Sequence, residues 1–140
     1  QNRVDFFQRL SARYKQVDSG GRLLNNIGGP VPMGLHNKRR WLSEYKFHIA
    51  FENTDAPGWI TEKFTDPFIA HTVPIYWGTQ TVTEDFNPEA FINANDFPTH
   101  DALIDYVRRV DQDDALYLNT SPPRPLKQRP NAASPAGAAR

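Results

Sequence analysis

The sequence contains no cysteine among its 140 residues, which excludes disulfide bonds and cysteine metal sites and is compatible with a reducing compartment. It also has no excess of one charge, because 16 Lys and Arg side chains balance 16 Asp and Glu side chains. A nucleic-acid-binding domain needs a basic face, so we do not expect nucleic acid to be a partner. No apolar run is long enough to span a bilayer, and the first residues do not resemble a signal peptide.

This length predicts one domain with a real core. The chain lacks an initiator Met and starts within a predicted helix, so we interpret it as a fragment of a longer protein. Residues 1–118 have the composition of a folded domain. Residues 119–140 are rich in Pro and Ala and bury too little apolar surface to offset the entropy of ordering, so we predict a disordered tail there.

The most informative stretch runs from residue 46 to residue 64. Phe47, Ile49 and Phe51 recur with the period of two that is typical of a strand. Residues 55–58 have the composition of a turn, and Thr61 can cap a helix that follows. The stretch therefore predicts a strand, a loop and a helix in succession.

The predicted helix places charged residues at its start. Ile60, Phe64 and Phe68 recur at helical spacing and are expected to face a core. Glu62 and Lys63 lie in the first turn, where free N–H groups and the positive end of the helix dipole attract anions. Open α/β sheets bind ligands beyond the carboxyl ends of their strands, so this unit predicts a phosphate site with a carboxylate and an ammonium group at its mouth.

The rest of the chain alternates between predicted helices and strands. We predict helices over residues 3–15, 38–44 (capped by Asn37), 83–86 and 100–111 (capped by Thr99). We predict strands over residues 16–19, 73–77 and 91–93, and a kink or early end at Pro67. This alternation predicts an α/β fold with a mostly parallel sheet and helices on both faces.

Several blocks of the sequence resemble the α-1,3/α-1,4-fucosyltransferases of glycosyltransferase family 10. They are Phe51-Glu52-Asn53-Thr54, Ile60-Thr61-Glu62-Lys63 and Val73-Pro74-Ile75-Tyr76-Trp77-Gly78, and the resemblance covers about residues 1–118. It implies a Rossmann-like domain that forms the C-terminal, donor-binding half of a GT-B glycosyltransferase. It also implies inverting transfer of fucose from GDP-fucose to a hydroxyl group of an acceptor oligosaccharide or glycoconjugate.

The same resemblance suggests which residues bind the donor. Lys63 and Arg3 match residues that contact the donor diphosphate, and Glu62 is placed to accept hydrogen bonds from the ribose hydroxyls. Asn53 is expected to bond the nucleotide or its own loop. Trp59 stands where the family usually has tyrosine, and its indole offers only a donor N–H in place of a phenolic hydroxyl.

Other polar residues admit a structural interpretation. Glu52 has two open roles, contact with the fucose or support of the loop. The only Asp-x-Asp pair is Asp111-Gln112-Asp113, at the end of a predicted surface helix, where such charges are usually solvated. We therefore expect no obligate metal and no cofactor, with GDP-fucose as the donor substrate. His48 and Tyr76 are expected to be structural.

We predict no catalytic residue within this chain, because the family resemblance assigns the base to an N-terminal domain. An alternative is a catalytically incomplete nucleotide-binding module or remnant without turnover, and another nucleotide-sugar transferase of the same architecture is a third hypothesis. Any peripheral membrane association is expected through parts outside this chain. By analogy the protein is expected in the cytoplasm or at the membrane of a bacterium, or at the Golgi membrane of a eukaryote.

Overall fold

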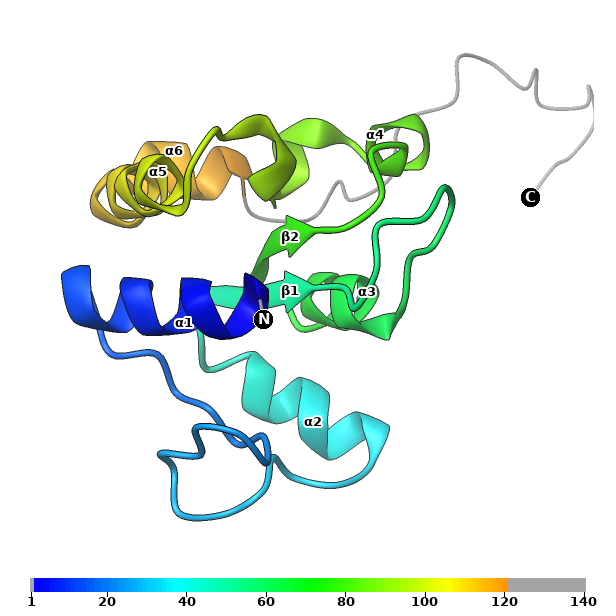
Figure 1. The fold of residues 1–140 in the computed structure, drawn as a ribbon. Coiled ribbons are helices and arrows are strands. Elements are labelled where there is room, and N and C mark those ends of the chain that lie inside the picture. Colours follow the sequence, from blue (N-terminus) through cyan, green and yellow to red (C-terminus); the bar gives the residue numbers. More distant parts are fainter. Residues whose placement is uncertain (1, 121–140) are drawn as a thin grey trace, which may run out of the picture.

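A parallel three-stranded sheet forms the centre of the computed structural model, which describes residues 2–120. The strands are β1 (Phe47–Phe51), β2 (Val73–Trp77) and β3 (Ile92–Asn93), and they lie in the order β1-β2-β3. Figure 1 shows β1 and β2 running in the same direction, with helices around them. This confirms the predicted α/β class and its Rossmann-like parallel sheet.

The helices alternate with the strands along the chain. They are α1 (Asn2–Arg13), α2 (Leu35–Leu42), α3 (Glu62–Ile69), α4 (Val82–Asp85), α5 (His100–Gln112) and α6 (Asp114–Thr120), with 3-10 turns η1 (Pro88–Ala90) and η2 (Ala94–Asp96). In the part of the chain that the structure describes, no helix has the length and apolar character needed to cross a bilayer. Helix α6 includes residues 119 and 120 of the predicted tail, and residues 121–140 lie outside the described part.

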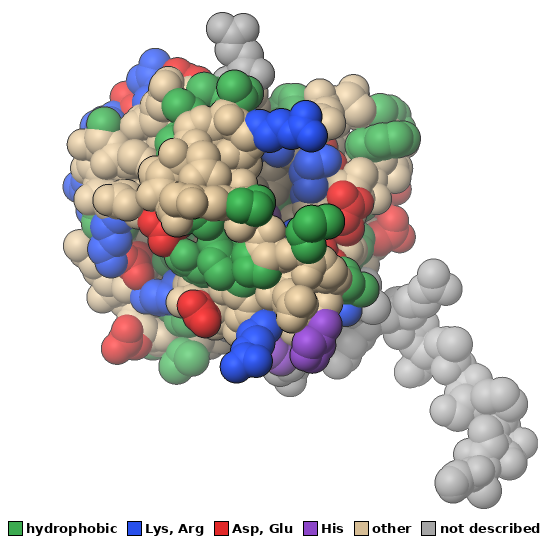
Figure 2. Space-filling view, turned by 90° about the horizontal axis from the view of Figure 1, so that it is seen from below, with side chains coloured by type: hydrophobic (Ala, Val, Ile, Leu, Met, Phe, Trp, Pro, Cys, Tyr) green, Lys and Arg blue, Asp and Glu red, His purple; other side chains and the backbone are tan. Residues whose placement is uncertain are grey.

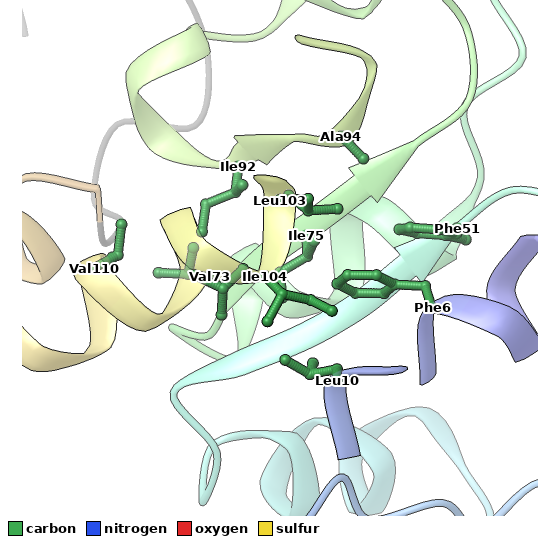
Figure 3. Close-up of a cluster of buried hydrophobic side chains, with 11 residues drawn as sticks. Phe6, Leu10, Phe51, Val73, Ile75, Ile92, Ala94, Leu103, Ile104 and Val110 are labelled. Carbon is green, nitrogen blue, oxygen red and sulfur yellow. The ribbon is translucent and has the colours of Figure 1, made fainter. Parts of the chain in front are cut away.

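Each face of the sheet has its own hydrophobic cluster. The first cluster joins β1 and β2 to α1 and α5, and Figure 3 shows its side chains converging from these elements. Its buried members are Phe6, Leu10, Phe51, Val73, Ile75, Ile92, Ala94, Leu103, Ile104, Val107 and Val110. The second cluster joins α3, α4 and η1 to the opposite face. Its buried members are Ala50, Phe64, Phe68, Tyr76, Val82, Ala90 and Phe91.

Helix α3 follows the sequence closely. The Thr61 hydroxyl accepts a hydrogen bond from the Lys63 backbone N–H at 3.3 Å, which is the predicted cap. Phe64 and Phe68 are buried in the second cluster and Ile60 packs against it, as their spacing predicts. The helix ends at Ile69, soon after Pro67, because proline removes a backbone donor and crowds the preceding turn.

Two local predictions are wrong. Residues 16–19 form no strand, because no neighbouring strand among residues 2–120 pairs with them and side chains bond one of their edges instead. The Ser11 hydroxyl accepts from the Val17 N–H at 3.3 Å, and the Asn26 amide donates to the Val17 carbonyl at 2.8 Å. Helix α2 begins at Leu35 rather than after Asn37, whose side chain instead donates back to the Met33 carbonyl at 3.0 Å.

The expectation that Asp111 is solvated is also wrong. Its side chain is only 7% exposed, and its carboxylate pairs with the ammonium groups of Lys15 and Lys46, each at 2.7 Å. The Tyr14 hydroxyl donates to the same carboxylate at 2.5 Å. Burial alone would raise the pKa of Asp111, but the hydrogen bonds from Lys15, Lys46 and Tyr14 outweigh it and hold this pKa well below its usual range.

We expect Asp111→Asn to lower the free energy of unfolding by about 1–2 kcal/mol at pH 7, because two lysines lose their shared counter-ion and both are partly exposed. A depressed pKa stabilises the folded state fully above the unfolded value of about 3.9 and loses this effect as the pH falls through the folded value. The difference from wild type should therefore persist from pH 7 to about 5 and shrink only in more acidic buffer.

Urea unfolding at a series of pH values measures this difference. Asp105→Asn on the same helix is the matched control, since Asp105 is exposed, and it should stay within about 0.5 kcal/mol of wild type. Equal stability of the Asp111 and Asp105 variants would show that the Asp111 contacts contribute nothing.

Candidate functional site

The candidate site lies where β1 ends and α3 begins. Glu52 directly follows β1, and its side chain is fully buried. Its carboxylate accepts hydrogen bonds from the Thr61 backbone N–H at 2.8 Å and from the Thr61 hydroxyl at 2.8 and 2.9 Å. Glu52 therefore closes residues 53–60 into a loop and fixes the start of α3, which favours the loop-supporting role over contact with the sugar.

Lys63 is held beside this buried carboxylate. Its ammonium group lies 3.7 Å from Glu52 Oε2, and its side chain is only 27% exposed. A surface lysine with no role would be solvated, whereas this one is directed toward the junction of the strand and the helix. Lys63 thus places a positive charge at the N-terminus of α3, where the helix dipole is also positive.

Arg3 and Asn53 meet at the same end of β1. The Arg3 guanidinium donates to the Asn53 side-chain oxygen at 3.2 Å, although 50 positions separate the two residues along the chain. Both residues are exposed and accessible to a ligand. The fold therefore brings the start of α1 to the loop that follows β1, so that two of the candidate residues lie side by side.

Glu62 and Trp59 lie on the solvent side of the loop and helix. Glu62 is the first residue of α3 and is exposed, and Trp59 is 52% exposed. Gly58 before it has a φ of 72°, a left-handed conformation that favours glycine, and its N–H donates to the Thr81 hydroxyl at 3.2 Å. The indole of the loop and the carboxylate in the first turn of α3 are thus both exposed to solvent.

The end of β2 forms the inner wall of the site. The buried Tyr76 hydroxyl accepts from the Thr79 N–H at 3.0 Å, and burial raises the pKa of Tyr76 to about 12. A Cβ on Gly78 would collide with the Tyr76 hydroxyl and come within 3.0 Å of Glu52. The side chains of Tyr76 and Glu52 therefore leave room for no residue larger than glycine at position 78. Only the buried position of Tyr76 was foreseeable from the apolar run of β2, and the roles of Thr79 and Thr81 had no sequence signal.

His48 lies within β1 and is partly buried. Burial, followed by the nearby charge of Lys38, lowers the pKa of His48 to about 4. The imidazole is therefore neutral at pH 7 and has no positive charge with which to bind a phosphate. This agrees with the expectation that His48 is structural.

The family profile described as "Glycosyltransferase family 10 (fucosyltransferase) C-term" matches residues 1–120. The chain belongs to this family. Among family relatives, it is 39% identical over 121 residues to "Alpha-(1,3)-fucosyltransferase FucT" of Helicobacter pylori, covering 86% of this chain and 24% of the relative. It is 36% identical over 121 residues to "GDP-fucose protein O-fucosyltransferase 3" of Homo sapiens, covering 81% of this chain and 25% of that protein.

Solved structures of the family share the fold. The structure titled "Crystal Structure of alpha1,3-Fucosyltransferase with GDP-fucose" superposes with a TM-score of 0.78 at 39% identity, covering 85% of this chain and 34% of that one. A structure of alpha1,3-fucosyltransferase with GDP matches with the same TM-score. The fold is therefore that of the C-terminal part of a GT-B fucosyltransferase. The chain spans about a quarter of the length of the relatives named above.

We expect Glu52→Ala to lower the free energy of unfolding by about 2–4 kcal/mol, because it leaves the Thr61 N–H without its buried acceptor and Lys63 without its counter-ion. Glu62→Ala, ten positions later in the exposed first turn of α3, is the matched control and should cost no more than about 0.5 kcal/mol. Chemical denaturation followed by tryptophan fluorescence compares the two variants. A Glu52 variant as stable as the Glu62 variant would contradict the anchoring role.

Proposed function

We propose that the protein is an α-1,3-fucosyltransferase that transfers fucose from GDP-fucose to a hydroxyl group of an acceptor glycan. In this proposal the chain supplies the donor-binding half of the enzyme. The observation that carries it is the position of Lys63, held at the N-terminus of α3 beside the buried Glu52. Membership of the family and the related structures of alpha1,3-fucosyltransferase with GDP-fucose and with GDP support the choice of donor.

In the proposed complex, the donor diphosphate lies at the N-terminus of α3. Lys63 and Arg3 neutralise its charge, which grows as the bond from fucose to the phosphate breaks. Glu52 holds the Lys63 ammonium before the donor arrives, so little reorganisation is needed when the charge develops. These two cations perform the task that a divalent metal performs in other glycosyltransferases, and transfer is proposed to need no metal.

The remaining candidates are assigned to the nucleoside. Glu62 accepts hydrogen bonds from the ribose hydroxyls, because an exposed carboxylate at the start of the helix can reach a ligand bound there. Asn53, already oriented by Arg3, bonds the nucleotide or the loop backbone. Trp59 lines the nucleotide with the face of its indole.

The acceptor hydroxyl must lose a proton, and inversion requires its direct attack on the sugar carbon. We place the base in a domain outside this chain. The isolated chain then corresponds to the alternative function, a module that binds GDP-fucose without turnover. The chain matches only 24% of the length of the H. pylori relative, which supports placing the base outside this chain. Membrane contact is also assigned to other parts of the protein, at the Golgi membrane in a eukaryote or the cytoplasmic membrane in a bacterium.

We expect Lys63→Met in the full-length enzyme to lower kcat by about 10²–10³-fold and to weaken GDP binding, because the charge matters most when the leaving group departs. Methionine keeps the apolar stem, so the fold should be preserved. Lys63→Arg should recover only part of the activity, because the planar guanidinium group of arginine cannot take the position of the compact ammonium group of lysine.

Steady-state kinetics and thermal melts distinguish a lost function from a lost fold. Arg109→Ala, which removes one exposed positive charge from α5, is the matched control and should leave kcat unchanged. A folded Lys63→Met enzyme with the kcat and GDP affinity of wild type would place the phosphate site elsewhere.

Binding should be selective for the guanine nucleotide and independent of metal. Calorimetry with GDP, UDP and ADP, each with and without EDTA, is expected to show GDP binding most tightly and EDTA changing nothing. Equal affinity for the three nucleotides would exclude a GDP-fucose site, and loss of binding in EDTA would exclude the metal-independent mechanism.

A further inference from the structure

The first turn of α1 is held from two sides. On one side, the Arg3 guanidinium donates to the Asn53 side-chain oxygen at 3.2 Å. On the other side, the Asp5 carboxylate lies 2.6 Å from Nδ1 of His100, the first residue of α5. Among residues 2–120, these are the hydrogen bonds that join side chains of this turn to other elements. One of the two involves a candidate donor-binding residue, and the other has no assigned role.

Phe6 lies between these two contacts and is fully buried. Its ring stacks on that of Phe51 at the end of β1, with ring centroids 5.1 Å apart (Figure 3). Successive residues of an α-helix are about 100° apart around its axis, so Arg3 lies roughly 60° to one side of Phe6 and Asp5 about 100° to the other. If α1 rolled about its axis, Arg3 and Asp5 would therefore move in opposite directions relative to the sheet. A contact that fixes Asp5 also fixes Arg3.

His100 is well placed to fix Asp5. Its side chain is only 24% exposed, and its ring packs edge-on against Phe6 at a centroid distance of 5.4 Å. The side chain of Thr99 caps α5 directly before it, so the imidazole projects from a fixed helix start. The hydrogen bonds from Arg9 and His100 lower the pKa of Asp5, so its carboxylate is ionised at neutral pH. An ionised acceptor requires a hydrogen on Nδ1, and it makes the hydrogen bond strong and directional.

A second contact joins the same two helices farther along α1. Charged side chains of both signs are spread over the face that Figure 2 shows. Between α1 and α5, by contrast, they form a row, in which Asp101 pairs with Arg13 and lies 3.6 Å from Arg9. Asp101 adjoins His100 in sequence, yet its partners lie beyond the first turn of α1. It therefore joins the two helices without holding the turn that carries Arg3.

We propose that His100 is a positioning residue for donor binding, whose hydrogen bond to Asp5 sets the roll of α1 and thereby the place of Arg3. This inference rests on the proposed function, in which Arg3 neutralises the charge of the donor diphosphate. When Arg3 turns from Asn53 to the donor, the hydrogen bond between Asp5 and His100 still ties the first turn of α1 to α5. His100 touches neither the donor nor the reacting atoms in this proposal, and it acts by orienting a group that does.

Kinetics of the full-length natural enzyme test this proposal with two variants of His100. His100→Leu removes the donor N–H and keeps an apolar side chain against Phe6, and it should lower kcat by about 10-fold. His100→Asn loses the ring and keeps an amide N–H near the position of Nδ1, so its kcat should stay within about twofold of wild type. Asp101→Asn weakens the other contact between the helices and is the matched control, also expected within about twofold.

A double-mutant cycle with Arg3 shows whether His100 acts through it. Arg3→Met alone should lower kcat by about 10²-fold, because one positive charge at the diphosphate is lost. Adding His100→Leu to Arg3→Met should then lower kcat by less than about twofold further, since no guanidinium remains to be positioned. A full additional loss of about 10-fold would overturn the inference and leave the proposed function intact.

The single variants decide the matter as well, with thermal melts to show that each is folded. A His100→Leu enzyme as active as wild type would overturn the positioning role. A His100→Asn enzyme less active than His100→Leu would also overturn it, because packing of the ring would then matter more than the hydrogen bond. If Arg3→Met left kcat and GDP affinity unchanged, the inference would fail together with the proposed role of Arg3. Lys63→Met would then show whether the donor site itself is misplaced.

Discussion

The buried carboxylate of Glu52 is the contact on which the candidate site depends. It lies at the end of β1, yet its hydrogen-bond partners belong to the residue that caps α3. A carboxylate without these partners would be costly to bury, so the strand and the helix can pack only when the loop between them is closed. The same group holds Lys63, and the stability of the fold and the geometry of the site therefore rest on one side chain.

Much of this arrangement was predictable from local patterns in the sequence. The period of two in β1, the apolar run of β2 and the Thr61 cap each correspond to an element of the structure. The position of Lys63 at the start of α3 was predictable for the same reason, since it arises from a strand and a helix adjacent in sequence, and the anion site there stays a prediction. The resemblance to glycosyltransferase family 10 added Arg3, whose contact with Asn53 no local pattern indicates.

The features that escaped prediction depend on residues distant in sequence. Phe6 packs against Phe51 with ring centroids 5.1 Å apart and is fully buried, although the two residues lie far apart in the sequence. Helix α1 places Phe6 and Leu10 in the first cluster beside residues of β1, β2 and α5, and no pattern within the helix itself indicates these partners. A strand also requires a partner, which is why the extended residues 16–19 form no ladder.

The Asp111 cluster has a geometric consequence for the whole edge of the sheet. Lys15 lies just before residues 16–19, and Lys46 immediately precedes β1. The carboxylate of Asp111 forms an ion pair with both lysines. The two chain segments are therefore held together at their amino ends by Asp111. Asn53 follows the other end of β1, so the Asp111 cluster fixes one end of this strand and the Arg3–Asn53 hydrogen bond holds the end at the candidate site.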